Sequence, residues 1–186
     1  MKMPELRNRI NKDELKVRLA QEKIERVTFS FYRYVKIEDP KELRDQLFIH
    51  WTNLNCFGRI YVAHEGINAQ MSVPKSNWDN FVAQLYKDER FNNVPFKIAV
   101  DGNGKSFYKL IIKVKEKVVA DGINDPNFDA ANTGTYLNAE GFNKAIEDPN
   151  TIVVDMRNHY ESEVGRFDKA FCPDADTFRE ELPLVV

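Results

Sequence analysis

An acidic residue and an arginine follow a short apolar run near the end of the chain. Residues 151–154, Thr-Ile-Val-Val, predict a buried strand of the parallel-sheet type, and Asp155, Arg157 and Glu161 come after it. Open α/β sheets place ligands at the carboxyl ends of their strands, so Asp155 stands where a site is expected. Arg157 and Glu161 are close enough in sequence to pair, and paired charges usually organise structure. We therefore predict a loop-organising ion pair rather than direct chemistry.

The chain has two cysteines, Cys56 and Cys172. A nucleophilic thiol needs a lowered pKa, which backbone N–H groups and the positive end of a helix dipole supply. Cys172 has no strand before it and an aspartate two places after it, and nearby carboxylates raise a thiol pKa. The sequence therefore favours a partly buried structural thiol over a nucleophile. Two cysteines make neither a disulfide framework nor a metal site.

The segment from His64 to Asn68 is His-Glu-Gly-Ile-Asn, which is similar to the zinc-protease motif His-Glu-x-x-His. Asparagine replaces the second histidine, and the run falls at a glycine-containing turn where two ligands do not share a helical face. With three histidines in the chain, no metal site is predicted. His64, Glu65 and Asn68 are instead candidates for a polar binding edge beside a strand.

A strand expected over 106–119 carries four lysines on the face of Ile111. Such a row can track a phosphate backbone, or it can be a solvated face whose lysines discourage edge pairing. Tyr32 and Tyr34 could stack on bases, but core packing is the prediction for them. The candidate RNA-binding residues are Arg59, His64, Lys109, Lys113, Lys115 and Lys117.

The net charge of −2 hides an asymmetry: residues 1–120 carry 22 Lys and Arg against 15 Asp and Glu, whereas residues 121–186 carry 5 against 14. A basic first part suits a phosphate-bearing partner, although compositional scatter or mutual attraction of the two parts gives the same pattern. The 42% of hydrophobic residues is enough for a folded core. No apolar run approaches a membrane span, and the start lacks a secretory signal, so we expect a soluble cytoplasmic protein.

Periodicity predicts the elements that position these residues. Residues 1–26 form an N-terminal helical extension, and residues 27–120 follow the order β-α-β-β-α-β with an extra strand, which is that of a ferredoxin-like domain. The expected strands are 28–37, 59–63, 67–73, 94–100 and 106–119, the last two around a turn at 101–104. The expected helices start at Asp13, at Pro40 with Asp39 as cap, and after Ser76 as cap.

Periodicity disappears over 121–134, where we place a linker. Residues 135–186 form the last segment. Asn138 is expected to cap a helix that runs to about Glu147, with Phe142, Ala145 and Ile146 facing inward.

Six segments spread over the chain together resemble one family. They are Ser-Phe-Tyr-Arg-Tyr at 30–34, Phe-Gly-Arg-Ile-Tyr-Val-Ala-His-Glu-Gly-Ile-Asn-Ala at 57–69, Gly-Lys-Ser-Phe at 104–107, Val-Ala-Asp-Gly-Ile at 119–123, Asn-Thr-Gly-Thr-Tyr at 132–136 and Asp-Met-Arg-Asn-His-Tyr-Glu at 155–161. The family is that of the rhodanese-containing tRNA uridine hydroxylases. The resemblance implies an α+β ferredoxin-like (acylphosphatase-like) N-terminal domain, followed over 135–186 by part of an α/β rhodanese domain.

The resemblance also implies an activity: oxygen-dependent hydroxylation at C5 of the wobble uridine of certain tRNAs by a rhodanese cysteine. At the rhodanese offsets Asp155, Arg157, Glu161 and Gly165 match as a loop framework, whereas Arg166 stands where the family has histidine. Cys172 does not fit the family's Cys-x-x-x-x-Arg loop, so no catalytic residue is assigned. tRNA is the implied partner and molecular oxygen the implied co-substrate, and no other cofactor is evident.

Because no such cysteine loop precedes Val186, the sequence predicts a fragment that is inactive alone. We expect its incomplete rhodanese segment to pack on the N-terminal domain, to form a homodimer or to stay partly disordered. Two other functions remain open: a rhodanese-type sulfurtransferase or persulfide carrier, and a non-catalytic RNA-binding module.

Overall fold

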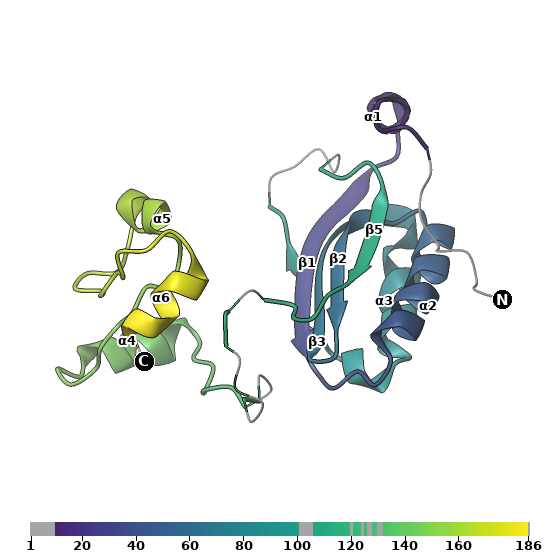
Figure 1. The fold of residues 1–186 in the computed structure, drawn as a ribbon. Helices are drawn as coiled ribbons and strands as arrows, with labels where there is room; N and C mark the ends of the chain where they lie inside the picture. Colours follow the sequence, from purple (N-terminus) through teal and green to yellow (C-terminus); the bar gives the residue numbers. More distant parts are fainter. Residues whose placement is uncertain are drawn as a thin grey trace. The chain divides into compact units, whose positions relative to one another are not determined.

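The computed structural model describes residues 10–100, 106–119, 121–123, 125, 128–129 and 132–185. The contacts of the chain divide it into two compact units, Met1–Val118 and Val119–Val186 (Figure 1). Each unit is described by itself. The finer domain boundaries expected from the sequence, at 26, 120 and 134, stay predictions.

The first unit is built on one sheet of five strands in the order β4-β1-β3-β2-β5. Neighbours among the first four strands are antiparallel, and β5 is parallel to β2. The strands are β1 (Arg26–Tyr34), β2 (Phe57–Ala63), β3 (Gly66–Pro74), β4 (Lys97–Ile98) and β5 (Leu110–Val114). With helices after β1 and β3, this is the predicted ferredoxin-like order with one added strand.

The predicted pairing of the last two strands around a turn at 101–104 was wrong. β4 pairs with β1 at one edge of the sheet, and β5 pairs with β2 at the opposite edge. Packing explains the separation, because Leu110 and Ile112 of β5 are buried in the core beside Ile60 of β2. Both strands are also shorter than expected, and the turn predicted at 101–104 lies outside the described residues.

Two of the three predicted helix starts are confirmed, and one predicted cap was wrong. Asp39 caps α2 (Pro40–Asn53) as expected, because its carboxylate accepts the N–H groups of Lys41 and Glu42 at 2.9 Å. Ser76 does not cap α3 (Trp78–Tyr86), since a short 3₁₀ turn, η1 (Lys75–Asn77), comes before that helix. The first helix, α1 (Lys12–Gln21), starts within one residue of the predicted Asp13, and the side chain of Asn11 caps it. A second 3₁₀ turn, η2 (Glu89–Phe91), follows α3.

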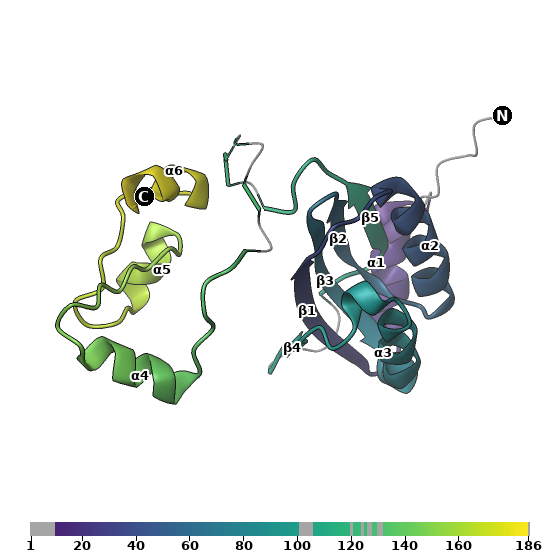
Figure 2. The same ribbon diagram turned by 90° about the horizontal axis from the view of Figure 1, so that it is seen from below.

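Helices α2 and α3 cover one face of the sheet and form the core with it (Figure 2). Phe81 of α3 lies 5.1 Å from Phe29 and 5.6 Å from Trp51 between ring centroids. Alternate residues of β3 face these helices and have no exposed surface: Ile67, Ala69, Met71 and Val73. The core is therefore one-sided, and the described residues of the first unit place no helix on the opposite face.

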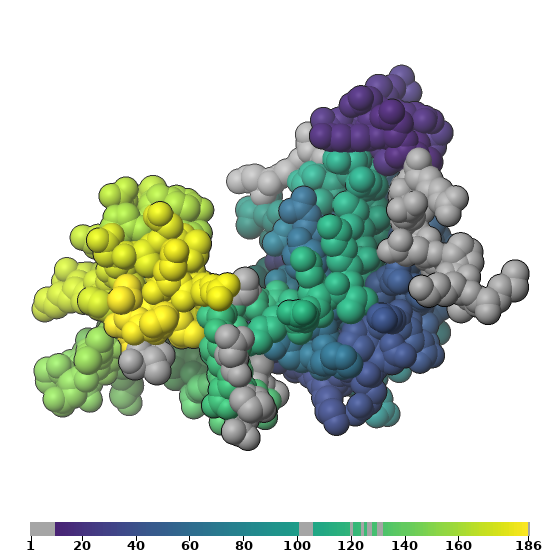
Figure 3. All heavy atoms as spheres, viewed as in Figure 1, coloured from purple at the N-terminus to yellow at the C-terminus, as the bar shows by residue number. Residues whose placement is uncertain are grey.

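A buried arginine fastens the first unit where β1 begins. The Arg26 guanidinium donates to Glu22, to Ser72 and to the carbonyl of Asn55, and it lies 4.0 Å from the ring centre of Phe57. Burial lowers the pKa of Arg26, and the neighbouring Glu22 acts in the opposite direction. Because Glu22 follows α1, this cluster holds α1 at the end of the sheet, where the dark purple atoms lie at the top of Figure 3.

The second unit contains three short helices: α4 (Ala139–Glu147), α5 (His159–Val164) and α6 (Phe178–Val185). The side chain of Asn138 accepts the N–H of Gly141 at 2.8 Å and caps α4 as predicted. The strand expected over 151–154 is reduced to one parallel bridge between Val154 and Phe171. A strand forms where consecutive backbone groups pair with a neighbouring strand. Within the described residues Val154 has this single bridge partner, so the strand is not extended.

The second unit leaves much apolar surface exposed. No residue of α4 is buried, and the predicted inward position of Ile146 was wrong, because that side chain is 41% exposed. Phe142 instead contacts Phe167, with ring centroids 4.7 Å apart, and Phe167 is itself 55% exposed. Large apolar side chains such as these are usually covered by another part of the protein or by a partner.

A substitution at Gly66 tests the geometry of the hairpin between β2 and β3. Its φ of +149° is unfavourable for other residues, and a Cβ would lie 2.0 Å from the carbonyl oxygen of Arg33. We expect Gly66→Ala to lower the free energy of unfolding by about 2 kcal/mol or more, measured by urea denaturation. Gly134→Ala is the control, because a Cβ there meets nothing within 4 Å. Equal stability of the two variants would contradict this description of the hairpin.

Candidate functional site

The predicted loop framework gathers around Arg157. Its guanidinium makes a two-pronged pair with Asp155, with Nε 2.9 Å from Oδ1 and Nη2 2.7 Å from Oδ2. Nη2 also donates to the carbonyl oxygen of Gly165 at 2.6 Å, which closes the loop across α5. The ion pair exists, but its predicted partner was wrong: Glu161 accepts from the side-chain amide of Asn158 at 3.2 Å instead.

The charges of this loop stabilise one another. Hydrogen bonds from Arg157 lower the pKa of Asp155, and the charge of Arg166 acts in the same direction. The same contacts raise the pKa of Arg157. Asp155 is thus held as a carboxylate that already has its cation, which makes it a poor general acid or base near neutral pH. The pair is suited to positioning the loop.

A cavity of about 450 Å³ lies beside this pair. Apolar side chains form most of its wall, with the charged groups of the loop at one side. The residues that line it are Phe142, Val153, Val154, Asp155, Arg157, Gly165, Arg166 and Phe167. Cys172 is not among them, although its thiol is near enough to Arg157 to help raise the pKa of that guanidinium.

The two cysteines differ in environment. Cys172 is half-buried, and its Sγ lies 3.7 Å from the carbonyl oxygen of Ala170. Cys56 is 1% exposed in the first unit, and burial raises the pKa of its thiol to about 12. Such a thiol stays protonated and unreactive at neutral pH.

His64 and Glu65 fasten backbone at the end of the β2–β3 hairpin. The Nδ1 atom of His64 lies 2.9 Å from the carbonyl oxygen of Ile37, and Glu65 accepts the N–H of Val118 at 2.7 Å. The His-Glu-Gly-Ile-Asn sequence did not predict that these two side chains would bind backbone groups of other segments. Within the described residues no group of three or more His, Cys, Asp or Glu side chains is placed to hold a metal ion.

The lysine row predicted along one long strand was wrong. β5 ends at Val114 because its partner pairing ends at Val62, so Lys115 and Lys117 follow the strand and Lys109 precedes it. Of the predicted lysines, Lys113 alone lies within β5, and its side chain is exposed.

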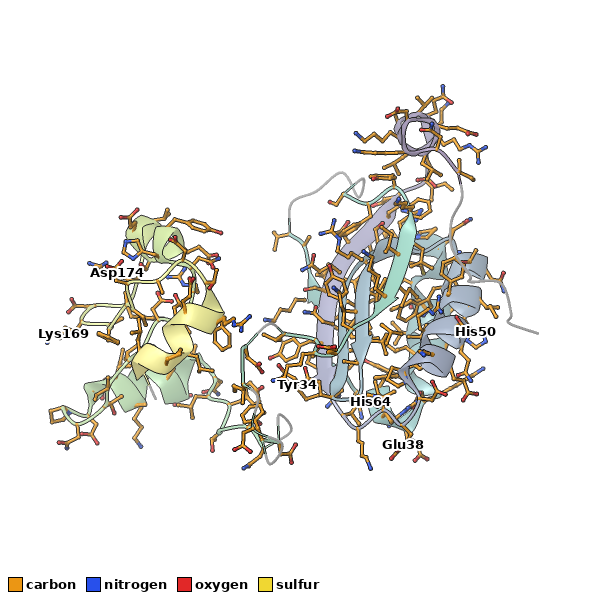
Figure 4. All side chains as sticks on the ribbon, viewed as in Figure 1. Tyr34, Glu38, His50, His64, Lys169 and Asp174 are labelled. Atoms are coloured by element: carbon orange, nitrogen blue, oxygen red, sulfur yellow. The ribbon has the colours of Figure 1, made fainter. Side chains whose placement is uncertain are left out.

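Strand register assembles a different surface, which we call the open sheet face. It is the side of the sheet opposite α2 and α3 (Figure 4, where Tyr34 is labelled on it). Strand register places on it Arg26, Thr28, Ser30, Tyr32, Tyr34, Phe57, Arg59, Tyr61, Ala63, Gly66, Asn68, Gln70, Ser72, Pro74, Lys97, Ile111 and Lys113. The core packing predicted for Tyr32 was wrong, because that side chain is 45% exposed, whereas its neighbour Phe31 is buried.

Sequence reasoning missed this face because its members come from five separate segments. Alternation along each strand was the available signal, since Phe29 and Phe31 are apolar while Ser30 and Tyr32 are not. What was lacking was the register that sets Tyr32, Asn68 and Tyr61 side by side.

The sheet and the helices on one of its faces define an acylphosphatase-like domain. The family model described as the UPF0176 acylphosphatase-like domain matches residues 26–118. The chain therefore belongs to the UPF0176 family. The expected acylphosphatase-like N-terminal domain is thereby confirmed.

Curated relatives extend the match over the whole chain. The chain is 54% identical over 185 residues to the tRNA uridine(34) hydroxylase of Escherichia fergusonii and 53% identical over 185 residues to the protein of that name in Escherichia coli K12. Each alignment covers 99% of this chain and 53% of the relative, so the chain spans about half the length of the curated relatives it matches. These matches confirm the resemblance to the tRNA uridine hydroxylase family.

Among solved structures, the dark-state BLUF protein BlrB aligns with 49% of this chain and 74% of its own. The TM-score of 0.35 and the 15% identity are too low to bear on the fold. None of the helices in the described residues has the length and apolar character needed to cross a membrane.

The Asp155 carboxyl offers a test of the loop. Its lowered pKa means that the pair contributes stability above about pH 4, the ordinary range of an aspartate, and that this contribution is lost as pH falls through the lowered value. An NMR titration of the Asp155 side chain should show a midpoint below that range. In Arg157→Gln the midpoint should rise towards the ordinary value. An unchanged midpoint would show that Arg157 is not the controlling partner.

Thiol labelling tests the contrast between the cysteines. With Ellman's reagent at neutral pH, we expect the half-buried Cys172 to react quickly and Cys56 to react only on unfolding, because burial keeps Cys56 protonated. Cys172→Ser should remove the fast phase, and Cys56→Ala should leave it. A fast phase that survives Cys172→Ser would mean that the core around Cys56 opens.

Proposed function

We propose that this chain is part of a tRNA-modifying enzyme that hydroxylates C5 of the wobble uridine, position 34, in an oxygen-dependent reaction. The supporting observation is the identity of 53–54% over 99% of the chain to proteins named tRNA uridine(34) hydroxylase. At this identity the matched half has the same fold, and its binding surfaces are expected to act on the same kind of substrate. The location that goes with a tRNA substrate in this proposal is the cytoplasm.

The second unit is, in this proposal, the first part of a rhodanese domain. The proposal is supported by Asp155, Arg157 and Gly165, which stand at the rhodanese offsets and form a closed loop. Neither cysteine of the chain suits catalysis in this proposal, because Cys56 is buried and protonated and Cys172 does not lie in a Cys-x-x-x-x-Arg loop. Because the alignment covers 53% of the relatives, the proposal places the catalytic cysteine in the part of the full-length protein that this chain does not span.

Exposed apolar side chains support the same assignment. Val164 is 90% exposed, Ile152 is 80% exposed and Phe167 is 55% exposed, although each is of a type that normally packs in a core. Further strands and helices of a rhodanese domain would cover them. Residues 1–186 alone are expected to associate into a homodimer through this surface.

The loop in this proposal has a positioning role. Arg157, before α5, donates to the carbonyl oxygen of Gly165, after α5. This hydrogen bond fixes the distance between the two segments that flank the helix. A nucleophile placed against this loop would have its approach set by that separation. Arg166, where the family has histidine, adds positive charge beside Asp155.

The test uses a bacterial strain that lacks its own tRNA uridine(34) hydroxylase. The full-length gene, read past the codon for Val186, should restore hydroxylated uridine at position 34, measured by mass spectrometry of digested tRNA. Arg157→Gln should lower the yield about tenfold or more if loop positioning is worth at least 1.4 kcal/mol in the transition state. Cys172→Ser is the matched control and should leave the yield unchanged.

Two results would overturn the proposal. Hydroxylation by residues 1–186 alone, surviving Cys172→Ser, would place the chemistry within these residues. Thiosulfate–cyanide sulfur transfer by the full-length protein, without hydroxylated tRNA, would make it a sulfurtransferase.

A further inference from the structure

We propose that the open sheet face binds an unpaired RNA segment, with Tyr32 and Tyr61 stacking on bases and the basic side chains around them contacting phosphates. This inference deepens the proposed function and rests on it, because the RNA would be the single-stranded part of the tRNA substrate. The surface is assembled by strand pairing and does not involve the charged loop of the second unit.

Register places the two tyrosines in one row across the sheet. Tyr32 of β1 pairs with Asn68 of β3, which pairs with Tyr61 of β2, and Tyr61 pairs with Lys113 of β5. Paired residues point to the same face of a sheet, and neighbouring strands lie about 4.8 Å apart. The two rings are therefore based about 10 Å apart, with the short polar side chain of Asn68 between them. That spacing leaves room for bases to lie on or between the rings.

The adjacent row supplies the polar surroundings. It runs across all five strands from Lys97 through Ser30, Gln70 and Arg59 to Ile111. Lys97, Gln70 and Arg59 are exposed. A basic residue thus stands towards each end of this row, and amide and hydroxyl groups stand between them.

Each of the two tyrosines has a lysine close to its ring. The Nζ of Lys97 lies 5.9 Å from the ring centre of Tyr32, and the Nζ of Lys115 lies 5.8 Å from that of Tyr61. Proteins that bind single strands combine aromatic rings that stack on bases with cations that follow the backbone. Both components occur here twice, and the two rings lie on β1 and β2, which are not adjacent in the sheet.

The charge of the open sheet face has a single sign. None of its member residues is an aspartate or a glutamate. Glu22, beside one end of the face, is paired with Arg26, and Glu65, at the hairpin end, accepts the N–H of Val118. The helical side of the same unit differs, since α2 and α3 carry carboxylates such as Asp45 and Asp79. Charge complementarity therefore favours a polyanion on the sheet side.

The composition of the face favours unpaired RNA over a protein partner or a duplex. Its apolar members, Phe57, Ala63, Pro74 and Ile111, lie at its margins, whereas protein interfaces usually have an apolar centre. A duplex hides the flat faces of its bases, so tyrosine rings could not stack on them. An RNA single strand with its bases turned towards the sheet can stack those bases on the rings and place its phosphates beside the cations.

The test is binding of a fluorescently labelled single-stranded oligouridine to residues 1–186, followed by anisotropy at several salt concentrations. Tyr32→Thr/Tyr61→Thr should weaken binding about fivefold or more for each stacked base and leave the salt dependence unchanged. Threonine retains strand propensity, so circular dichroism should confirm an intact sheet. Arg59→Gln/Lys113→Gln should weaken binding and reduce the slope of log affinity against log salt by about 0.7 for each phosphate that is no longer neutralised.

The matched control is Lys41→Gln/Lys87→Gln, which removes two exposed lysines from the helical side. It should bind oligouridine as the unmodified chain does. The proposal is overturned if this control loses as much affinity as Arg59→Gln/Lys113→Gln, or if the tyrosine variant binds normally. It is also overturned if duplex RNA or polyglutamate competes as well as unlabelled oligouridine, because the face would then be a general anion or protein surface.

The outcome is separable from that of the proposed function. Tyrosine-dependent binding of oligouridine without hydroxylated tRNA in the complementation strain would retain the surface and remove the activity. Normal hydroxylation by a full-length protein carrying Tyr32→Thr/Tyr61→Thr, together with normal oligouridine binding, would retain the activity and remove the surface.

Discussion

The first unit depends on the register of β3, its central strand. Ile67, Ala69, Met71 and Val73 are all withdrawn from water on the helical side, so a shift by one residue would expose the whole set. β1 and β2 are aligned to β3 on either side, and β4 and β5 are aligned to those strands in turn. The burial of one side therefore dictates which residues stand together on the other. The open sheet face is a consequence of the core.

Much of this arrangement follows from local sequence. The cap at Asp39, the turn before Gly66 and the alternation in β1 each have a short-range physical cause, and they give the ferredoxin-like order directly. The positions of β4 and β5 do not follow, because a glycine-rich turn between two apolar runs usually predicts a hairpin. β4 pairs with the free edge of β1, and β5 pairs with the free edge of β2. These edges exist only after β1, β2 and β3 have formed the sheet, so local sequence does not reveal them.

The candidate sites show the same division. Asp155 and Arg157 are two residues apart, so their pairing could be foreseen as a charged loop, whereas the choice between Asp155 and Glu161 as partner depended on the path of α5. Tyr32 and Tyr61 lie 29 positions apart and became neighbours across Asn68 through two pairings that no local pattern encodes. The lysine pattern suggested a surface with one strand as its support. The folded chain instead distributes exposed basic residues over three strands and joins them to aromatic ones.

The two-residue length of β4 has a consequence for motion. Loop-closure entropy rises with the length of chain enclosed, and the pairing of Phe29 with Ile98 encloses far more chain than the β2–β3 hairpin does. Against this entropy cost β4 contributes the pairing of only two residues, and both of them are exposed. Local opening is expected to begin where few buried contacts hold a strand, so the β4 edge should exchange its amide hydrogens well before the centre of the sheet. Lys97 lies on that edge, and the border of the open sheet face beside Tyr32 is thus its most adaptable part.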